Sequence, residues 1–300
     1  MRAVRFHEYG DHQVLTLGDA PEPHAGPGQV RIRVQATSVN AIDWKIRAGY
    51  LHEMMPATFP VTPGSDAAGV VDEIGDGVTD VHVGDAVFGL VQDGGAAELA
   101  VLTAWARVPS RWTPEQAAAA GLVSTTAIAG LDVLGDLSGK TVLIEGAAGG
   151  VGSAAVEIAI ARDATVIGTA SPANHDFVRS LGATPVGYGD GLADRIAELA
   201  PDGVDAALDT AGSGSLAELV AIVGDGSRVA TVADYNAASL GVAMVMGSAN
   251  AEANLALAAE LGASGAYTPR VHGSYALDHA AEAHAHAQDG HPQGKVVITP

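Results

Sequence analysis

One short segment limits the possible folds of this chain more than any other. A β-branched run, TVLIE over 141–145, leads into the glycine-rich stretch GAAGGVG over 146–152 and then into an amphipathic helical pattern. A tight turn with positive φ, a backbone open to a phosphate, and close helix–strand packing each exclude a β-carbon. Unpaired N–H groups at the start of the helix then face the phosphates, so the segment predicts a dinucleotide-binding loop. The expected contacts are Gly146, Ala147, Gly149, Gly150, Val151 and Gly152.

Strand-like and helix-like runs alternate around that loop. After Pro114 the chain is Ala-rich and helical over 115–136, and the alternation that follows predicts parallel βαβ units. The expected strands cover 141–146, 164–170, 183–188, 204–211, 227–233 and 240–246. The expected helices cover 150–163, 174–182, 192–200, 215–223 and 253–262. Six strands in this order predict an α/β fold with a doubly wound, six-stranded parallel sheet, that is, a Rossmann domain.

The two ends of the chain have β character instead. Short alternating segments broken by Gly and Pro fill residues 1 to about 110, which is typical of all-β structure. The tail returns to β character over 266–277, adds a helix over 278–290, and ends in a strand over 295–300 that can rejoin the first domain. A length of 300 residues also favours two domains. We expect a β-barrel-type domain from 1–114 plus 267–300, and a Rossmann domain from 115–266.

The residues that end the second expected strand bear on the choice of dinucleotide. An NAD-preferring site places Asp or Glu there to bind both ribose hydroxyls, and that carboxylate repels a 2′-phosphate. This chain has Gly168-Thr169-Ala170-Ser171, with no acid. Ser171 can donate to a phosphate, and His175 and Arg179, one turn apart on the next helix, can supply positive charge. The sequence favours NADPH over NADH, and the alternative for Arg179 is a solvated helix residue.

The turn after the fourth expected strand is a further candidate for cofactor contact. It reads Asp209-Thr210-Ala211-Gly212, and ligands of doubly wound sheets gather at the carboxyl edge of the strands. A small, Gly-containing turn would let the nicotinamide ribose approach, whereas a purely structural role for Asp209 explains that residue equally. Val232, in the fifth expected strand, joins the candidate contacts.

The absence of cysteine and the strong negative charge exclude several classes of function. With no cysteine, the chain has no disulfide, thiolate zinc ligand or cysteine nucleophile. Asp and Glu number 35 against 15 Lys and Arg, a formal charge of −20, which repels nucleic acid and anionic membrane surfaces. The N-terminus reads as a strand rather than a signal peptide, and no apolar run reaches the ~20 residues of a membrane helix. We expect a soluble cytoplasmic protein.

Several motifs, taken together and in order, indicate a family. They are SVNAIDWKIRAG over 38–49, PGSDAAGVV over 63–71, VGDAVFGL over 83–90, the GAAGGVG loop, HDFVRSLGA over 175–183 and GKVVI over 294–298. The chain resembles the medium-chain dehydrogenase/reductase superfamily, and within it the zinc-free quinone oxidoreductase, or zeta-crystallin-like, branch. The resemblance runs nearly end to end. It implies a GroES-like substrate domain, a Rossmann domain and a homodimer paired through an edge strand.

The resemblance also bears on metal binding. Zinc-dependent members carry Cys, His and a further Cys or acid at the catalytic metal, whereas Asn40 and Ser65-Asp66 occupy those regions here. Such a site has lost its strongest ligands, so we expect no zinc. The tail histidines His279, His284 and His286 do not change this expectation, because His284 lies off the face that the other two share. Without a Lewis acid, hydride addition to an electron-poor acceptor remains feasible, whereas alcohol oxidation loses its usual support.

By resemblance, Asn40 and Asp43 belong to the substrate side of the active site, and Tyr50 is a candidate proton donor or aromatic wall. Asn40 can donate a hydrogen bond to a carbonyl, and Asp43 either orients its neighbours or has a structural role. Other residues implied by the resemblance face the nicotinamide or the substrate: Ser65, Thr125 or Thr126, and Lys295. The segment GGAAEL over 94–99 lacks an aromatic that relatives often have, and Arg270 replaces a small residue or Pro, so the pocket has its own shape.

The resemblance implies NADPH-dependent hydride transfer to a quinone or an activated, α,β-unsaturated carbonyl. Two alternatives stay open. The first is an enoyl-thioester or polyketide-type tailoring reductase. The second, of another class, is a non-catalytic NADPH-binding sensor or structural protein.

Overall fold

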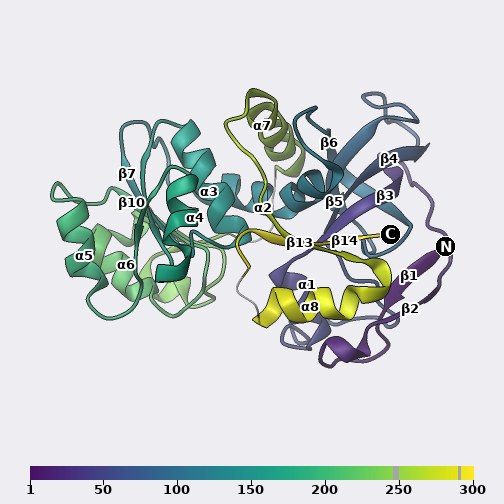
Figure 1. The fold of residues 1–300 in the computed structure, drawn as a ribbon, viewed down its shortest axis with the longest axis horizontal. Helices are drawn as coiled ribbons and strands as arrows, with labels where there is room; N and C mark the ends of the chain where they lie inside the picture. The colour runs from purple at the N-terminus through teal and green to yellow at the C-terminus, as the bar shows by residue number, and fades with distance from the viewer. Residues whose placement is uncertain (246–249, 290–291) are drawn as a thin grey trace. The chain divides into compact units, whose positions relative to one another are not determined.

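The computed structural model of the chain describes residues 1–245, 250–289 and 292–300. Its strands form two six-stranded sheets and one two-stranded sheet. Figure 1 shows the ribbon, coloured along the chain, with helices and strands labelled. The first of two compact units comprises Met1–Leu122, Ala251–Ala263 and Pro269–Pro300, and the second comprises Val123–Asn250 and Ser264–Thr268.

These bounds differ from the expected ones, 1–114 plus 267–300 and 115–266, at two helices. Helix α2 (Pro114–Asp132) begins in the first unit, because the N–H of Leu122 donates to Asp66 Oδ2 at 2.7 Å. Helix α7 (Ala251–Ser264) groups with the first unit except for its last residue, because a β-carbon at Gly262 would lie 2.4 Å from the Trp112 ring. Both helices take their packing partners from the β-rich part of the chain.

The second unit contains the parallel sheet that the alternating pattern predicts. Its strands are β7 (Thr141–Glu145), β8 (Thr165–Thr169), β9 (Thr184–Val186), β10 (Ala206–Asp209), β11 (Val229–Thr231) and β12 (Ala243–Met244). The sheet order is β12-β11-β10-β7-β8-β9 and every pairing is parallel, which confirms the doubly wound α/β fold. The chain changes direction across the sheet between β7 and β10, and this switch point is where such sheets bind ligands. Met246, the last residue of the sixth expected strand, lies outside the described residues.

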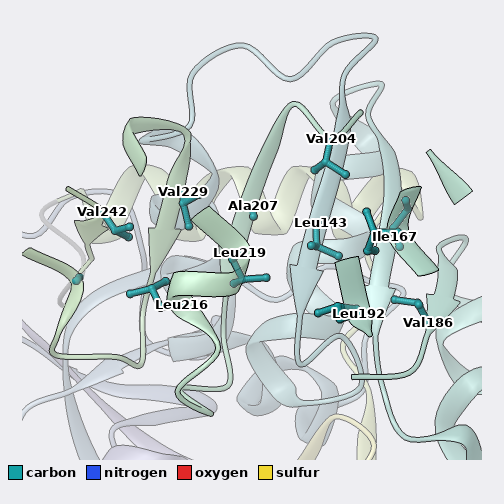
Figure 2. Packing of buried hydrophobic residues seen from close by; sticks show 12 residues of the cluster. Leu143, Ile167, Val186, Leu192, Val204, Ala207, Leu216, Leu219, Val229 and Val242 are labelled. Atoms are coloured by element: carbon teal, nitrogen blue, oxygen red, sulfur yellow. The ribbon is translucent and has the colours of Figure 1, made fainter. Parts of the chain in front are cut away.

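Helices cover this sheet and bury an aliphatic core. They are α3 (Gly150–Ala161), α4 (His175–Ser180), α5 (Leu192–Leu199) and α6 (Leu216–Val223). Leu192 and Ile196, one turn apart on α5, share a buried cluster with Leu143 of β7 and Leu219 of α6, as Figure 2 shows for the labelled members. The β-branched and leucine residues of the strands therefore fix the edge at which the glycine loop begins.

The first unit holds the other large sheet. Its strands are β3 (Val30–Val39), β4 (Asp66–Ile74), β5 (Ala86–Val91), β6 (Leu99–Arg107), β13 (Val271–Ala276) and β14 (Lys295–Thr299), and the two-stranded sheet consists of β1 (Arg2–Arg5) and β2 (Thr16–Asp19). The order is β13-β14-β3-β4-β5-β6, and β3 also pairs with β6, so β3 to β6 close into a barrel around an aliphatic core. The last strand, β14, lies antiparallel to β3.

Helices α1 (Ala41–Arg47) and α8 (Ala280–Asp289) pack together in the same unit. Arg47 of α1 is fully buried, and its Nη2 donates to Gln288 Oε1 of α8 at 2.8 Å. His284 of α8 is 1% exposed, and burial with the nearby Arg47 charge lowers its pKa to about 3, so it is a neutral core residue. His279, by contrast, is exposed. Short 3-10 turns occupy His12–Val14, Pro172–Asn174, Gly226–Arg228, Ala237–Leu240 and Leu277–His279. No helix in the described part of the chain is long and apolar enough to cross a membrane.

Candidate functional site

The glycine loop lies between the end of β7 and the start of α3. Gly146 has φ +76°, a left-handed conformation that favours glycine. A β-carbon at Gly152 would lie 2.1 Å from the Gly146 carbonyl oxygen, which no real contact allows. Gly149 precedes α3 in an extended conformation and meets no such limit. The backbone therefore requires glycine at two of the loop positions that the sequence predicts, 146 and 152.

The same loop has the chemistry that a dinucleotide pyrophosphate needs. The N–H groups of Gly150, Val151 and Gly152 form the first turn of α3, where no intrahelical acceptor exists, and they carry the positive end of the helix dipole. Ala147 is buried beneath the loop, and its N–H donates to the Thr169 carbonyl at 3.0 Å. The cradle is thus anchored to β8, and the residues present fit a nicotinamide dinucleotide.

The segment after β8 brings together two of the three residues expected to bind a 2′-phosphate. Ser171 is half-buried and starts the turn that carries His175, whose Nε2 lies 3.3 Å from the Ala170 carbonyl oxygen. Arg179 is 58% exposed, and its Nη1 lies 2.6 Å from Asp176 Oδ1 on the same helix. The guanidinium of Arg179 therefore already has an acidic partner, at the i, i+3 spacing that the sequence displays.

At the switch point, Asp209 holds the turn that follows β10. Its Oδ1 accepts from the N–H groups of Ala211 and Gly212 at 2.8 and 2.9 Å. Thr210 Oγ1 donates to the Glu145 carbonyl oxygen at 2.6 Å. Val232, just beyond β11, is half-buried, and its N–H donates to the Asp209 carbonyl oxygen at 3.0 Å. These contacts supply the structural role for Asp209 that the sequence left open.

Glu145, the last residue of β7, belongs to the same group, although sequence reasoning missed it. It is 2% exposed, and burial raises the pKa of its carboxyl. The signal for it was an acid that closes a β-branched strand immediately before the glycine loop. Thr125, also expected near the nicotinamide, is fully buried within α2.

In the first unit, the strand-end residues form a buried polar network. Asp66 is completely buried, and its Oδ1 accepts from Ser38 Oγ at 2.7 Å and from Asn40 Nδ2 at 2.9 Å. Lys295 of β14 donates through Nζ to Asn40 Oδ1 at 2.9 Å and to the Val39 carbonyl. Asn40 thus bridges an acid and an ammonium group, and burial lowers the pKa of Lys295.

Asp43 extends this network from α1. Its Oδ2 accepts from the N–H of Asn40 at 2.7 Å, the contact of a helix capping box, and its Oδ1 accepts from Ser65 Oγ. Burial raises the pKa of Asp43 to about 6, and the Asp66 charge adds to that rise. The carboxyl of Asp43 can therefore hold a proton at mildly acidic pH, with the Ser65 hydroxyl as its contact.

A cavity of about 660 Å³ opens in this unit beside that pair. Its wall includes Ile42, Asp43, Ile46, Met55, Ser65 and Gln92. Tyr50 is 69% exposed, does not line the cavity, and meets Trp44 edge-on at 6.1 Å between ring centroids. Asn40 also lies behind the wall, since both ends of its amide are used inside the network. The structure therefore brings Asp43 and Ser65 together at the cavity.

The structure also shows the surroundings of two features that depart from the family pattern, the GGAAEL segment and Arg270. A β-carbon at Gly94 would lie 2.1 Å from the Thr62 carbonyl oxygen, so the start of GGAAEL admits no side chain. Arg270 is half-buried next to β13, and its carbonyl accepts from the Lys295 N–H at 2.8 Å. Within the described ranges, no group of three or more His, Asp or Glu side chains could hold a metal ion.

Known families match both ends of this chain. The alcohol dehydrogenase GroES-like domain matches residues 26–110, and the zinc-binding dehydrogenase family matches residues 181–298. Among solved structures, an alcohol dehydrogenase superfamily protein from Novosphingobium aromaticivorans is 31% identical with a TM-score of 0.89, over 100% of this chain and 99% of that one. A mycobacterial protein complexed with NADPH is 28% identical with a TM-score of 0.88, over 100% of both chains.

A curated relative, the chloroplast envelope quinone oxidoreductase homolog of Arabidopsis thaliana, is 36% identical over 198 residues. That match covers 62% of this chain and about 60% of the relative's own length.

Proposed function

This chain belongs to the medium-chain dehydrogenase/reductase superfamily, and we propose that it is an NADPH-dependent, zinc-independent oxidoreductase whose acceptor is a quinone or an α,β-unsaturated carbonyl. The observation that carries the proposal is the Asp43–Ser65 pair at the wall of a cavity of about 660 Å³, in a chain that also has the glycine loop. The Arabidopsis relative is named as a quinone oxidoreductase homolog, which supports the quinone half of the acceptor class.

The bound nicotinamide would supply a hydride to the acceptor. The protein must then stabilise charge on the acceptor oxygen and deliver a proton. When Asp43 is protonated, its O–H can donate to Ser65 Oγ, which frees the Ser65 hydroxyl hydrogen to point at a carbonyl in the cavity. Ser65 is then the contact to the acceptor, Asp43 is the proton source behind it, and Asn40 positions Asp43 through its N–H.

The proposed zinc independence rests on the hydrogen bonds of the residues that occupy the metal-ligand positions. Asn40, Ser65 and Asp66 stand in the regions of the metal ligands of zinc-dependent relatives, and their polar atoms bond to each other and to neighbours. An amide and a hydroxyl are poor zinc ligands, and the single carboxylate of Asp66 already has three donors. We expect activity to survive exhaustive chelation.

The preference for NADPH rests on the end of β8, where Thr169, Ala170 and Ser171 stand in place of an acid. A carboxylate there would bind both ribose hydroxyls of NADH and repel the 2′-phosphate of NADPH. Ser171 and His175 lie together at this point, and the mycobacterial structure holds NADPH. The cofactor choice is tested by comparing dissociation constants for the two nucleotides.

Three further parts of the proposal concern the whole protein. We propose cytoplasmic location, no nucleic-acid or membrane partner, and a homodimer that extends the sheet at β12. Within the described residues β12 pairs only with β11, so its other edge is available to a second copy. Sedimentation at micromolar concentration tests the dimer.

The decisive experiment for function follows NADPH oxidation across small quinones, 2-alkenals and acyl thioesters. Turnover of quinones or alkenals is expected. Activity confined to thioesters would replace the proposal with a tailoring reductase. Saturable NADPH binding without turnover of any acceptor would replace it with a sensor or structural protein.

A further inference from the structure

Two acidic side chains end neighbouring strands at the point where the sheet order reverses. Glu145 is the last residue of β7 and Asp209 the last of β10, and the two are paired in register. They are 2% and 1% exposed. Ligands of doubly wound sheets bind at this edge, and the glycine loop begins at the next residue, Gly146. Two buried carboxyls therefore adjoin the place where an anionic pyrophosphate would bind.

Asp209 has the contacts of an ionised carboxylate. Its Oδ1 accepts from two backbone N–H groups, those of Ala211 and Gly212, and its Oδ2 accepts from Thr231 Oγ1 at 2.6 Å. All three partners are donors, and a carboxylate accepts without donating. The negative charge of the pair therefore belongs on Asp209.

Glu145 has the contacts of a neutral acid. Its Oε1 accepts from the hydroxyls of Ser213, at 2.7 Å, and Ser215. Its Oε2 is buried and has no hydrogen-bond partner among the residues that the structure describes. An ionised oxygen is costly to bury without a donor, whereas a neutral carboxyl has no charge to compensate. Because both oxygens of Asp209 accept from donors, the proton belongs on Glu145.

The surroundings hold that proton in place. The groups that act on Glu145 include the Asp209 carboxyl on β10 and the two serine hydroxyls before α6. The negative charge of Asp209 raises the pKa of Glu145 further. Burial and the neighbouring charge favour the neutral acid, while the serines favour the ion.

We propose that Glu145 is protonated beside an ionised Asp209 and that this proton is needed for tight dinucleotide binding, because it limits the pair to one negative charge beside the loop 146–152. Ionisation of Glu145 adds a second charge next to the pyrophosphate and weakens binding. Glu145 is thus a positioning residue that sets the pH range of cofactor affinity. The inference rests on the dinucleotide half of the proposed function and does not involve the acceptor.

Glu145→Gln tests the inference directly. The amide keeps an oxygen for the two serines, but it cannot ionise. NADPH dissociation constants are measured from about pH 6 to about pH 9 in the wild type, in E145Q and in E198Q, a control in which an exposed glutamate of α5 loses its charge. As pH rises, the affinity of the wild type and of E198Q for NADPH should fall at least about fivefold relative to that of E145Q. Titration of the nucleotide's own 2′-phosphate is common to all three proteins and cancels.

A second variant should shift the pH at which NADPH affinity falls instead of removing the pH dependence. Ser215→Ala deletes a donor that favours ionised Glu145, so affinity should fall at a higher pH than in the wild type. The proton on Glu145 is detected in the absence of cofactor, by the infrared band of a protonated carboxylic acid at neutral pH. That band should be present in the wild type and in E198Q and reduced in E145Q.

The outcomes separate the two proposals. Parallel pH profiles in the wild type and E145Q, or an equal infrared band in both, overturn the assignment of a proton to Glu145. Failure of every protein to bind NADPH at any pH, with the difference in the infrared band intact, overturns the proposed function and with it the role of the pair in binding.

Discussion

The two candidate sites of this chain are built from different parts of the polypeptide. The dinucleotide site of the second unit is made mainly of backbone, with N–H groups of α3 exposed by glycines at 146 and 152. The site of the first unit is made of side chains, with Asp43, Asp66 and Lys295 buried around Asn40. A site made of backbone should lose cofactor binding only when a substitution adds a β-carbon for which there is no room. A buried charge network should fail when any member is removed, and it should respond to pH.

The largest expected effect comes from removing the cation of the network. Lys295→Met leaves two buried acids, Asp43 and Asp66, without their ammonium partner, and breaking a buried pair costs about 3–5 kcal/mol of unfolding free energy. Urea denaturation at neutral pH measures this loss. Lys140→Met is the matched control, because Lys140 is 47% exposed and 3.7 Å from Asp205, and its loss should cost less than about 1 kcal/mol. Equal small losses would show that the first site is not a charge network.

The second prediction concerns pH. The folded pKa of Asp43 is about 6 against an ordinary 3.8, so the folded protein keeps a proton that the unfolded chain loses. The stability linked to that proton is complete below 3.8 and declines as pH rises through about 6, a loss of about 3 kcal/mol. Asp43→Asn should remove this part of the pH dependence, measured by urea denaturation across that range. Asp202→Asn, at an exposed position, should retain it.

The third prediction addresses the backbone site. Gly152→Ala puts a methyl group 2.1 Å from the Gly146 carbonyl oxygen, so the loop must shift and NADPH should bind about 100-fold more weakly, about 2.7 kcal/mol. Fluorescence titration measures the affinity. Gly187→Ala is the control in the same unit, since its β-carbon would meet nothing within 4 Å, and it should bind as the wild type does. A G152A protein with unchanged affinity would contradict the backbone origin of the site.

The smallest expected effect is at Arg179, a side chain proposed to add positive charge to the backbone site. Arg179→Ala should weaken NADPH by about 1 kcal/mol and leave NADH unchanged. Asp176→Asn should act in the opposite direction, because it releases Arg179 from an acidic partner 2.6 Å away. Equal effects on both nucleotides would remove Arg179 from the 2′-phosphate site.

The difference between a site made of backbone and a site made of side chains also explains how far the sequence could predict each one. The six strands and the glycine loop were predictable because β-branched runs and a cluster of glycines before a helical pattern are local signals. The network of the first unit was not, because its contacts join residues far apart, such as Lys295 and Asn40, at a separation of 255 positions. No local pattern shows that the Leu122 N–H donates to Asp66. The Arg179–Asp176 pair was different, since its spacing of three residues was visible in the sequence.

The position of Lys295 on the final strand has a consequence for synthesis of the chain on the ribosome. Asp43 and Asp66 leave the ribosome early, but the ammonium group that compensates their charge is translated only after the whole second unit. The parallel sheet can fold while translation continues, because domains of nascent chains generally fold as units. Until then the β-barrel unit has two acids without a compensating charge. Its last strand completes the sheet and supplies that charge at the same time. A nascent chain stalled before β14 should therefore resist protease in the parallel-sheet unit and remain sensitive in the barrel.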